Sequence, residues 1–485
     1  MTPMFPGWHL PTLRRKPKTD IQKLIDTKNE VHSMSLSRLS QYLSRYIPDT
    51  SFNRDKSTSF SRRRVFSVEN TFWGFFQQIL SVDGGCQEIV NQYRAIAKQR
   101  DGNTISPSTS AYCQARKKLK KSMLENILSN TQSHLLPMQI KHPLIDRRVV
   151  VADGSGISMA DTPKNQEQWP QPRSQKEGCG FPQARICALF DLNSGILLSH
   201  RMGNKKSHEL PLLRDQMDTF VEGDVFLGDK GFISYFDMLN LKEKGVDSVV
   251  GLAKRKPSQS CDAKRILSDN DLVVEWPKPK GGKTRYQLDE WENLPDKLAV
   301  RQIKVTVNQP GFRVKSFYIA TTLLNEKQYP ADVIAELYLK RWNVELYFRE
   351  LKTTLGLDVL RCKTPDMIHK EILMYFIVYN SIKLLANDSR MEGIQPDEMS
   401  FTSCRQFLNT FALNTIDWSL NDFHKRNPKE KLQQLISGCK LLKRFGRVEP
   451  RVQKRRPKPF KLLTRPRAEL RAELMGLGEW KTALT

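Results

Sequence analysis

Polar residues recur at helical spacing between Ala331 and Gly356 of this 485-residue chain. A helix turns about 100° per residue, and at that spacing five polar side chains fall within an arc of roughly 80°. Apolar residues flank the arc on both sides, which predicts one long helix whose charged stripe lies inside its buried face. A core accepts such charges only with compensation, so the stripe should face a ligand, a partner or a cavity. The five residues are Tyr338, Arg341, Glu345, Arg349 and Lys352.

Salt bridges within the helix are the simpler explanation of this stripe. Arg341 and Glu345 are four residues apart, as are Glu345 and Arg349, and composition alone favours that interpretation. The residue types, however, also fit the spacing Tyr-x2-Arg-x3-Glu-x6-Lys from Tyr338 to Lys352. This spacing resembles the signature of bacterial insertion-sequence DDE transposases, in the cut-and-paste group named for its Tyr-Arg-Glu-Lys motif (insertion sequence family four type).

Two aspartates stand at the ends of apolar segments upstream of this helix. Asp153 ends the run VVVAD and Asp229 ends VFLGD, and a glycine follows each closely. Such runs predict buried strands whose carboxylates emerge where the strand ends. Between Arg147 and Lys254 the segments predict three strands, a helix, a strand, a helix and a strand. That order is the pattern of a ribonuclease H-like core.

The family resemblance extends to these two strands. The family has an aspartate after a first strand and more often Gly-Asp-Arg-Gly-Phe after a fourth, where this chain has Gly-Asp-Lys-Gly-Phe and Lys230 keeps the charge. We therefore expect an α/β protein: a ribonuclease H-like catalytic core with a β-rich insertion, flanked by helical N- and C-terminal regions.

Asp153, Asp229 and Glu345 could converge to bind hard divalent cations, Mg²⁺ or Mn²⁺, through oxygen. Two ions about 3.5 to 4 Å apart can activate a nucleophile and stabilise a leaving 3′ oxygen in an in-line displacement. The reaction implied is metal-dependent phosphoryl transfer on DNA. By the resemblance, water releases a 3′ hydroxyl at the end of the element, and this hydroxyl attacks the opposite strand to form a hairpin. A second water reopens the hairpin, and the 3′ end joins target DNA.

Further side chains are expected to contact DNA in such a reaction. Arg341 and Lys352 would hold the phosphate near the cut, while Tyr338 hydrogen-bonds it. An extruded base would stack on an aromatic side chain, although an ordinary core or surface role is the simpler interpretation of each candidate. The aromatic candidates are Tyr318, Trp342, Trp276 and Trp291, and the other basic candidates for DNA binding are Arg349, Lys230, Arg455 and Arg456.

The composition favours a polyanionic partner. The chain has 78 Lys and Arg against 52 Asp and Glu, a formal net charge of +26, and a field of that sign attracts nucleic acid. Its eight cysteines include no Cys-x2-Cys pair, which indicates neither a zinc site nor a disulfide framework. No apolar run approaches the roughly 20 residues that span a bilayer, and no signal peptide is recognisable. A cytoplasmic, nucleoid-associated bacterial protein is expected.

The sequence predicts five regions. The first contains a helix with exposed basic positions, which could enter a DNA groove or could be an ordinary solvated face. The basic tail from Lys440 is expected to lie along a phosphate backbone, and the alternative is a tail that serves solubility. The regions are 1–140, mostly helical and DNA-binding; 145–254, the first part of the core; 255–317, the β-rich insertion; 318–370, the last strand and the Glu345 helix; and 371–485, helical with a basic tail. The exposed basic positions are Arg116, Lys117, Lys118, Lys120 and Lys121.

Pairing of two element ends implies a homodimer on DNA. Two other functions fit parts of the pattern, namely a metal-dependent DNA nuclease without strand transfer and a catalytically inactive DNA-binding repressor. The three acids argue against the repressor, because carboxylates held against phosphates only weaken binding.

Overall fold

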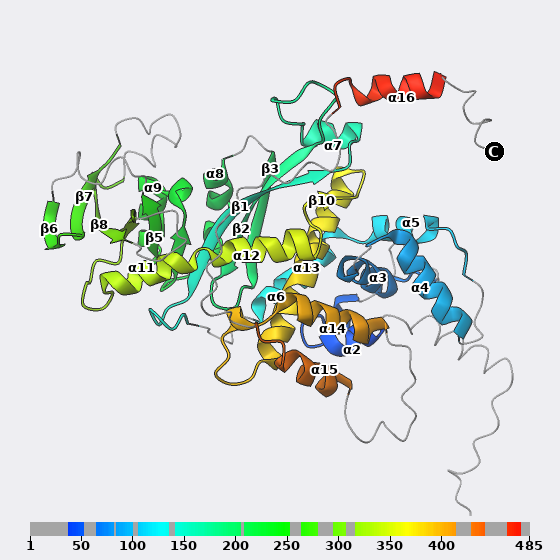
Figure 1. Cartoon of the computed structure of the whole chain (residues 1–485), viewed down its shortest axis with the longest axis horizontal. Coiled ribbons are helices and arrows are strands. Elements are labelled where there is room, and N and C mark those ends of the chain that lie inside the picture. The colour runs from blue at the N-terminus through cyan, green and yellow to red at the C-terminus, as the bar shows by residue number, and fades with distance from the viewer. Residues whose placement is uncertain are drawn as a thin grey trace, which may run out of the picture.

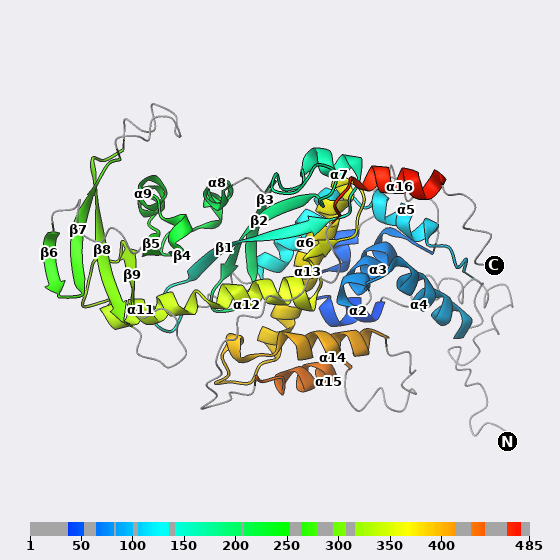
Figure 2. The same cartoon turned by 45° about the horizontal axis from the view of Figure 1, so that its top comes forward.

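The computed structural model describes residues 37–52, 65–81, 84–99, 105–134, 141–204, 208–252, 263–279, 294–306, 316–413, 428–441 and 463–476. The protein is a mixed α/β structure built around one large sheet (Figure 1). The strands β6 to β9 lie at one end of the molecule, and helices from both the N- and C-terminal parts gather at the other (Figure 2). No helix in the described part of the chain is long and apolar enough to cross a bilayer.

The sheet has the strand order β3-β2-β1-β4-β5-β9-β8-β7-β6, and β10 pairs with β1 off this path. Strand β1 runs antiparallel to β2 and parallel to β4, and β4 runs parallel to β5. The apolar run at the start of β1 is buried on both faces, as a central strand with a parallel neighbour requires. The strands of this half are β1 (Val149–Met159), β2 (Gln183–Asp191), β3 (Leu197–Asn204), β4 (Val225–Gly228), β5 (Asp247–Leu252) and β10 (Val359–Leu360).

Helices α8 (Glu209–Arg214) and α9 (Tyr235–Glu243) connect these strands in the order expected from the sequence. The five strands and these two helices follow one another as predicted, but a short helix, α7 (Pro163–Gln168), lies between β1 and β2 and was not predicted. The turn between β2 and β3 closes at Gly195 with φ of 71°. Alternate residues of β1 enter two different cores. Val149 and Val151 pack with α6, α12 and α13, while Val150 and Ala152 pack with α8 and α9.

The remaining strands extend this sheet antiparallel through the pair β5–β9. They are β6 (Ala263–Ser268), β7 (Asp271–Pro277), β8 (Lys297–Thr306) and β9 (Ser316–Thr321). Arg301 of β8 is only 1% exposed and donates to both carboxylate oxygens of Asp271, at 2.8 and 2.5 Å. Its third nitrogen donates to the carbonyl of Tyr329 at 2.6 Å, which ties this part of the sheet to the segment that begins α11.

The prediction of one continuous helix over Ala331–Gly356 is wrong. The segment forms α11 (Ala331–Lys340), α12 (Asn343–Arg349) and a π-helical turn over Glu350–Thr354. The break has a local cause: the N–H groups of Arg341 and Trp342 bond to carbonyls three residues back, at 3.1 and 3.2 Å, which tightens the helix there.

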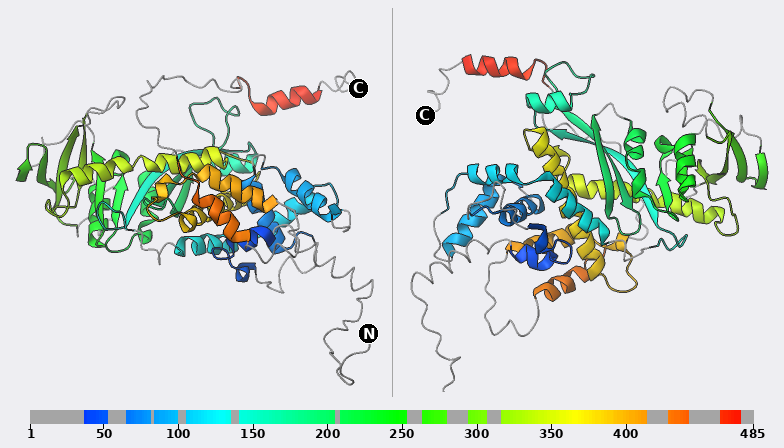
Figure 3. Two further views of the ribbon diagram at one scale, coloured as in Figure 1. Left: turned by 60° about the horizontal axis from the view of Figure 1, so that its bottom comes forward. Right: turned by 180° about the vertical axis from the view of Figure 1, so that it is seen from behind.

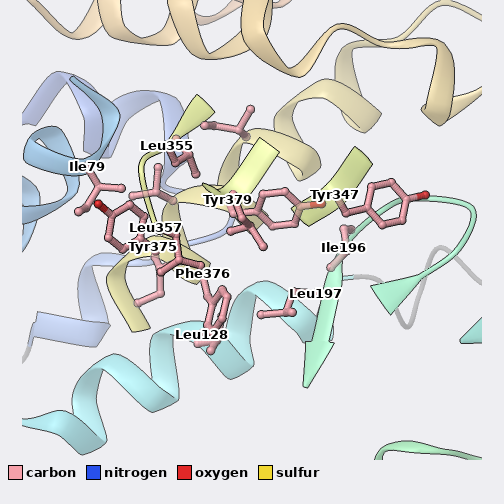
Figure 4. Close-up of a cluster of buried hydrophobic side chains, with 14 of the residues drawn as sticks. Ile79, Leu128, Ile196, Leu197, Tyr347, Leu355, Leu357, Tyr375, Phe376 and Tyr379 are labelled. Atoms are coloured by element: carbon pink, nitrogen blue, oxygen red, sulfur yellow. The ribbon is translucent and has the colours of Figure 1, made fainter. Parts of the chain in front are cut away.

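One buried helix, α13 (Pro365–Ser389), links the sheet to the helical parts. It packs against α3, α6, α14 and α15. Figure 4 shows Tyr375 and Phe376 of α13 in one apolar cluster with Leu128 of α6 and Leu197 of β3. The two views of Figure 3 show α16 standing apart from this bundle. The other helices are α2 (Ser37–Leu43), α3 (Val68–Leu80), α4 (Cys86–Gln99), α5 (Ser110–Lys118), α6 (Lys121–Ser133), α7 (Pro163–Gln168), α14 (Phe401–Leu413), α15 (Pro428–Ser437) and α16 (Arg467–Gly476).

Candidate active site

The prediction that Asp153 ends its strand is wrong, because β1 continues through it to Met159. Asp229 directly follows the neighbouring strand β4, as predicted. Strands β1 and β4 pair in parallel from Val149 opposite Val225 to Val151 opposite Leu227. The same register carried two residues further sets Asp229 opposite Asp153. Asp229 caps a short 3-10 turn, where its Oδ1 accepts a hydrogen bond from the N–H of Gly231 at 2.7 Å.

Burial and the charges of nearby acids both act on Asp153. Burial is the main cause that raises the pKa of Asp153 from 3.8 to about 6, and the negative charges of Glu209 and Asp229 act in the same direction. The N–H of Gly154 donates to Asp153 Oδ1 at 2.8 Å and, with the guanidinium of Arg341, acts against this rise. The acids thus repel one another, and Arg341 offsets only part of that repulsion.

Glu345 lies on α12, which packs against β1. The side chain of Glu345 is exposed. Apolar residues were predicted to bury both borders of the charged stripe, and this prediction is wrong for the border that contains Trp342 and Leu346. Trp342 is 48% exposed and Leu346 is 41% exposed, so the stripe borders solvent. Within the described ranges, no three acidic, histidine or cysteine side chains already converge on one metal-ion position.

Lys352 is anchored on β1 just beyond Asp153. Its Nζ donates to Ser155 Oγ at 3.1 Å and to the carbonyl of Gly156 at 3.0 Å. The π-helical turn contains Lys352, and its wider winding changes the direction in which side chains leave the helix. The last residue of the Tyr-Arg-Glu-Lys spacing therefore contacts the strand that holds the first aspartate.

Tyr338 and Arg341 approach the same edge from the end of α11. A Cβ added to Gly251 of β5 would lie 2.3 Å from the Tyr338 hydroxyl and 3.3 Å from the backbone nitrogen of Lys230. The hydroxyl therefore sits beside the residue that follows Asp229, and burial is the main cause that raises its pKa. Arg341 is 8% exposed, and its guanidinium carbon lies 4.6 Å from the centre of the Trp342 ring.

The other predicted DNA-binding residues are spread more widely. Arg349 and Lys230 are exposed, and Tyr318 on β9 is partly exposed, paired with Leu252 of β5. Trp276 packs against the core on the α8 and α9 face of the sheet. Arg455, Arg456 and Trp291 lie outside the described residues.

Arg116 is not an exposed position of a basic helix, contrary to the prediction. It is 5% exposed and donates to the sulfur atoms of Cys86 at 3.2 Å and Cys362 at 3.3 Å. Its guanidinium carbon also lies 3.9 Å from the centre of the Phe75 ring. Lys117, Lys118, Lys120 and Lys121 are exposed as expected, although Leu119 and Lys120 separate α5 from α6.

Sequence analysis missed one acid at this edge. Glu209, the first residue of α8, is the carboxylate with the largest effect on the pKa of Asp153. An acid in the first turn of a helix is common for reasons of helix stability alone. The sequence therefore held no signal that set Glu209 apart.

Comparisons with known proteins find similarity to transposases. The family model described as a transposase DDE domain matches residues 145–381. Transposase InsG for insertion sequence element IS4, from Escherichia coli K12, is 24% identical over 82% of this chain and 87% of its own length. The transposase for insertion sequence element IS421, from Escherichia coli, is 38% identical over 66 residues, which cover 13% of this chain and 18% of that protein.

Among solved structures, the piggyBac transposase synaptic complex with hairpin DNA aligns over 84% of each chain, with a TM-score of 0.38 and 10% identity. The family match contains both aspartates and the whole Tyr-Arg-Glu-Lys spacing, and the similarity to InsG extends over most of the chain. The matched domain and the similarity to InsG together support an IS4-family DDE transposase, a DNA-processing enzyme.

Proposed function

We propose that this transposase excises an insertion sequence by hydrolysis and hairpin formation at the element ends and joins the 3′ ends to target DNA. We assign the catalytic core to the ribonuclease H-like class, because β3-β2-β1-β4-β5 has three antiparallel strands followed by two parallel ones. The observation that carries the proposal is the register of β1 and β4 inside the matched transposase domain, because its continuation by two residues would bring Asp229 opposite Asp153.

Asp153, Asp229 and Glu345 would hold two Mg²⁺ or Mn²⁺ ions. The donor set fits, because carboxylate oxygens are the ligands of hard cations and the described acids repel one another without a positive charge between them. When bound, the ions would supply an activated nucleophile and charge stabilisation at the leaving 3′ oxygen.

The chain's other residues would hold the DNA in line for displacement. Arg341 is nearly buried beside Asp153, so its charge would meet a phosphate in a site with little water. The Tyr338 hydroxyl would donate a hydrogen bond to a phosphate oxygen. Lys352 would hold the cut DNA end from its position over β1. Trp342, half exposed and stacked with Arg341, is the best placed of the aromatic candidates to receive an extruded base.

Each chemical step exchanges one phosphoester bond. Water attacks the phosphodiester at the element end, the bond from phosphorus to the 3′ oxygen breaks, and that oxygen leaves as a hydroxyl. The hydroxyl then attacks the opposite strand to close a hairpin, and a second water reopens it. In the final step the same 3′ hydroxyl attacks target DNA and displaces a 3′ oxygen there.

We propose a homodimer on paired ends, acting in the bacterial cytoplasm at the nucleoid. The exposed Lys230 and Arg349 would add contacts to the phosphate backbone near the cut, and the basic segment that includes Arg455 and Arg456 would bind DNA elsewhere. Each dimer would bring two element ends together, so that both are cut and joined in one complex.

Glu345→Gln tests this proposal on DNA that carries the inverted repeats flanking the coding sequence. We expect loss of cleavage and of strand transfer in Mg²⁺, with binding to the ends retained, because the amide keeps the shape of the side chain and loses its charge. Glu336→Gln, at an exposed position of α11, is the matched control and should cleave normally. Equal loss of binding and cleavage in Glu345→Gln would assign Glu345 a structural role and refute the proposal. Cleavage without joining in the unaltered protein would indicate a nuclease instead.

A further inference from the structure

A buried ion pair joins the segment that carries Glu345 to helix α13. Glu350 is the first residue of the π-helical turn that follows α12, and its Oε2 lies 2.8 Å from Nζ of Lys383 on α13. The two side chains are only 16% and 9% exposed, so water screens little of their charge. Neither group is placed to meet DNA, and the reaction proposed above gives neither of them a role.

Three aromatic rings surround the ammonium group of Lys383. Its Nζ lies 5.1 Å from the centre of the Tyr347 ring, 5.6 Å from that of Tyr379 and 5.4 Å from that of Phe401. Rings at such distances attract a cation more strongly where water is scarce. Figure 4 shows Tyr347 and Tyr379 in the same cluster of buried side chains. The rings and the Glu350 carboxylate together compensate the ammonium group, and this sets where Glu350 lies.

The hydroxyl groups of the two tyrosines fix this arrangement on the turn between β2 and β3. Tyr347 of α12 donates to the carbonyl of Leu192 at 2.8 Å, and Tyr379 of α13 donates to the carbonyl of Gly195 at 2.7 Å. A Cβ added to Gly195 would lie 3.0 Å from the Tyr347 ring and 3.2 Å from Lys383 Nζ. The ion pair is therefore packed closely against a turn of the central sheet.

The π-helical turn is the element that this pair can control. The N–H of Leu355 donates to the carbonyl of Glu350 at 3.0 Å, a bond that spans five residues instead of four. Two side chains of the turn reach other elements: Glu350 contacts α13, and Lys352 contacts Ser155 and Gly156 of β1. Without the pair at its start, the turn would be free to rewind to α-helical spacing and rotate Lys352 away from β1.

We propose that the Lys383–Glu350 pair positions Glu345 and Lys352 for the reaction, because it fixes the start of the π-helical turn between them. This inference rests on the proposed function and adds to it two positioning residues that the Tyr-Arg-Glu-Lys spacing does not contain. A buried ion pair is often no more stabilising than apolar residues of the same volume, so its value here is the one arrangement that it selects. That arrangement sets Lys352 on β1 and orients the helix on which Glu345 lies.

Single-turnover cleavage of an element end at saturating DNA tests this inference, with the rate expressed per folded protein. We expect Lys383→Met and Glu350→Gln each to slow cleavage about tenfold or more with end binding unchanged, because small displacements of catalytic groups have effects of this size. The double variant should be as slow as either single variant, because one interaction can be lost only once. Lys370→Met is the matched control: this lysine of α13 is similarly buried but donates to the carbonyl of Lys117, and the variant should cleave at the unaltered rate.

The lifetime of the complex with the cut end separates positioning from a purely structural role. Glu350→Gln should shorten this lifetime, and adding Lys352→Ala to Glu350→Gln should shorten it no further, because Lys352 is already displaced. Two independent losses that multiply would overturn the inference. An unaltered cleavage rate in the double variant Lys383→Met with Glu350→Gln would overturn it as well. This double variant leaves no unpaired buried charge, so it provides an answer even if a single variant does not fold.

Glu345→Gln, measured beside these variants, distinguishes failure of this inference from failure of the proposed function. If Glu345→Gln cleaves normally, the proposed function itself fails. If Glu345→Gln loses cleavage while both variants of the pair cleave at the unaltered rate, only the positioning role of Lys383 and Glu350 fails.

Discussion

Asp153→Asn should make the metal-free protein more stable, although it removes a catalytic acid. In the folded chain, burial and neighbouring acids raise the pKa of this carboxyl from 3.8 to about 6. Asn keeps the shape of the side chain and carries no charge at any pH. The substitution therefore relieves a cost that the folded protein bears whenever Asp153 is ionised.

The size and the pH dependence of the effect follow from this pKa. A pKa that is higher in the folded state than in the unfolded state destabilises the fold as the pH rises, because the folded protein loses its proton less readily. A change from 3.8 to about 6 corresponds to about 3 kcal/mol at pH 8, at about 1.4 kcal/mol for each pH unit. The same linkage leaves roughly half of that advantage at pH 5 and almost none below pH 4.

Thermal unfolding in the presence of a chelator measures the difference at pH 8 and at pH 5. About 3 kcal/mol corresponds to a rise in the unfolding midpoint of about 6 °C or more for a domain of roughly 200 residues. Asp358→Asn, an exposed acid near the other end of β1, is the control and should change stability little. The reasoning is refuted if Asp153→Asn is no more stable than the unaltered protein at pH 8, or if its advantage is the same at both pH values. Added Mg²⁺ should stabilise the unaltered protein and not the variant.

Two further substitutions test the support of the site. Lys352→Ala removes an ammonium group that hydrogen-bonds to Ser155 and Gly156. We expect the cut DNA end to dissociate roughly tenfold faster from this variant in a gel-retention assay. An unchanged lifetime of the complex would show that Lys352 does not contact the DNA. Arg301→Ala leaves the buried Asp271 without its partner and should cost about 3 to 5 kcal/mol in chemical denaturation, whereas Arg301→Met combined with Asp271→Leu should recover most of that loss. A double variant as unstable as Arg301→Ala would contradict this account of the buried pair.

The strands that carry the two aspartates could be predicted from the sequence, but the end of β1 could not, because β1 continues past Asp153 to Met159. Apolar runs ending in Asp153 and Asp229 predict buried strands, and two buried strands that are parallel neighbours bring the ends of both runs to one edge. Local patterns of this kind depend on a few adjacent residues. The order of the five strands and of α8 and α9 followed from the same patterns, whereas α7 between β1 and β2 was not predicted.

The features that could not be predicted depend on contacts between distant segments. Arg116 looks like part of a solvated basic face, and only the sulfur atoms of Cys86 and Cys362 and the ring of Phe75 explain its burial. The break in the helix at Arg341 could not be predicted either, because the residues on both sides of it are compatible with a continuous helix. Helical periodicity placed Tyr338 and Arg341 on the helix face that lies toward Lys230 and Asp153. The same periodicity overestimated how deeply the surroundings of Glu345 are buried.

The contrast between strand and helix residues suggests how the site works as a unit. Asp153 and Asp229 are held by a strand register that apolar burial on both faces maintains, so the sheet keeps them close despite their repulsion. Glu345 is exposed on a short helix between a tightened turn and a π-helical turn, and its direction can change without disturbing the sheet. If a cation binds, Asp153 and Asp229 would hold it from the sheet and Glu345 would hold it from the short helix α12. Lys352, anchored on β1 by two hydrogen bonds, limits how far α12 can move away while this happens.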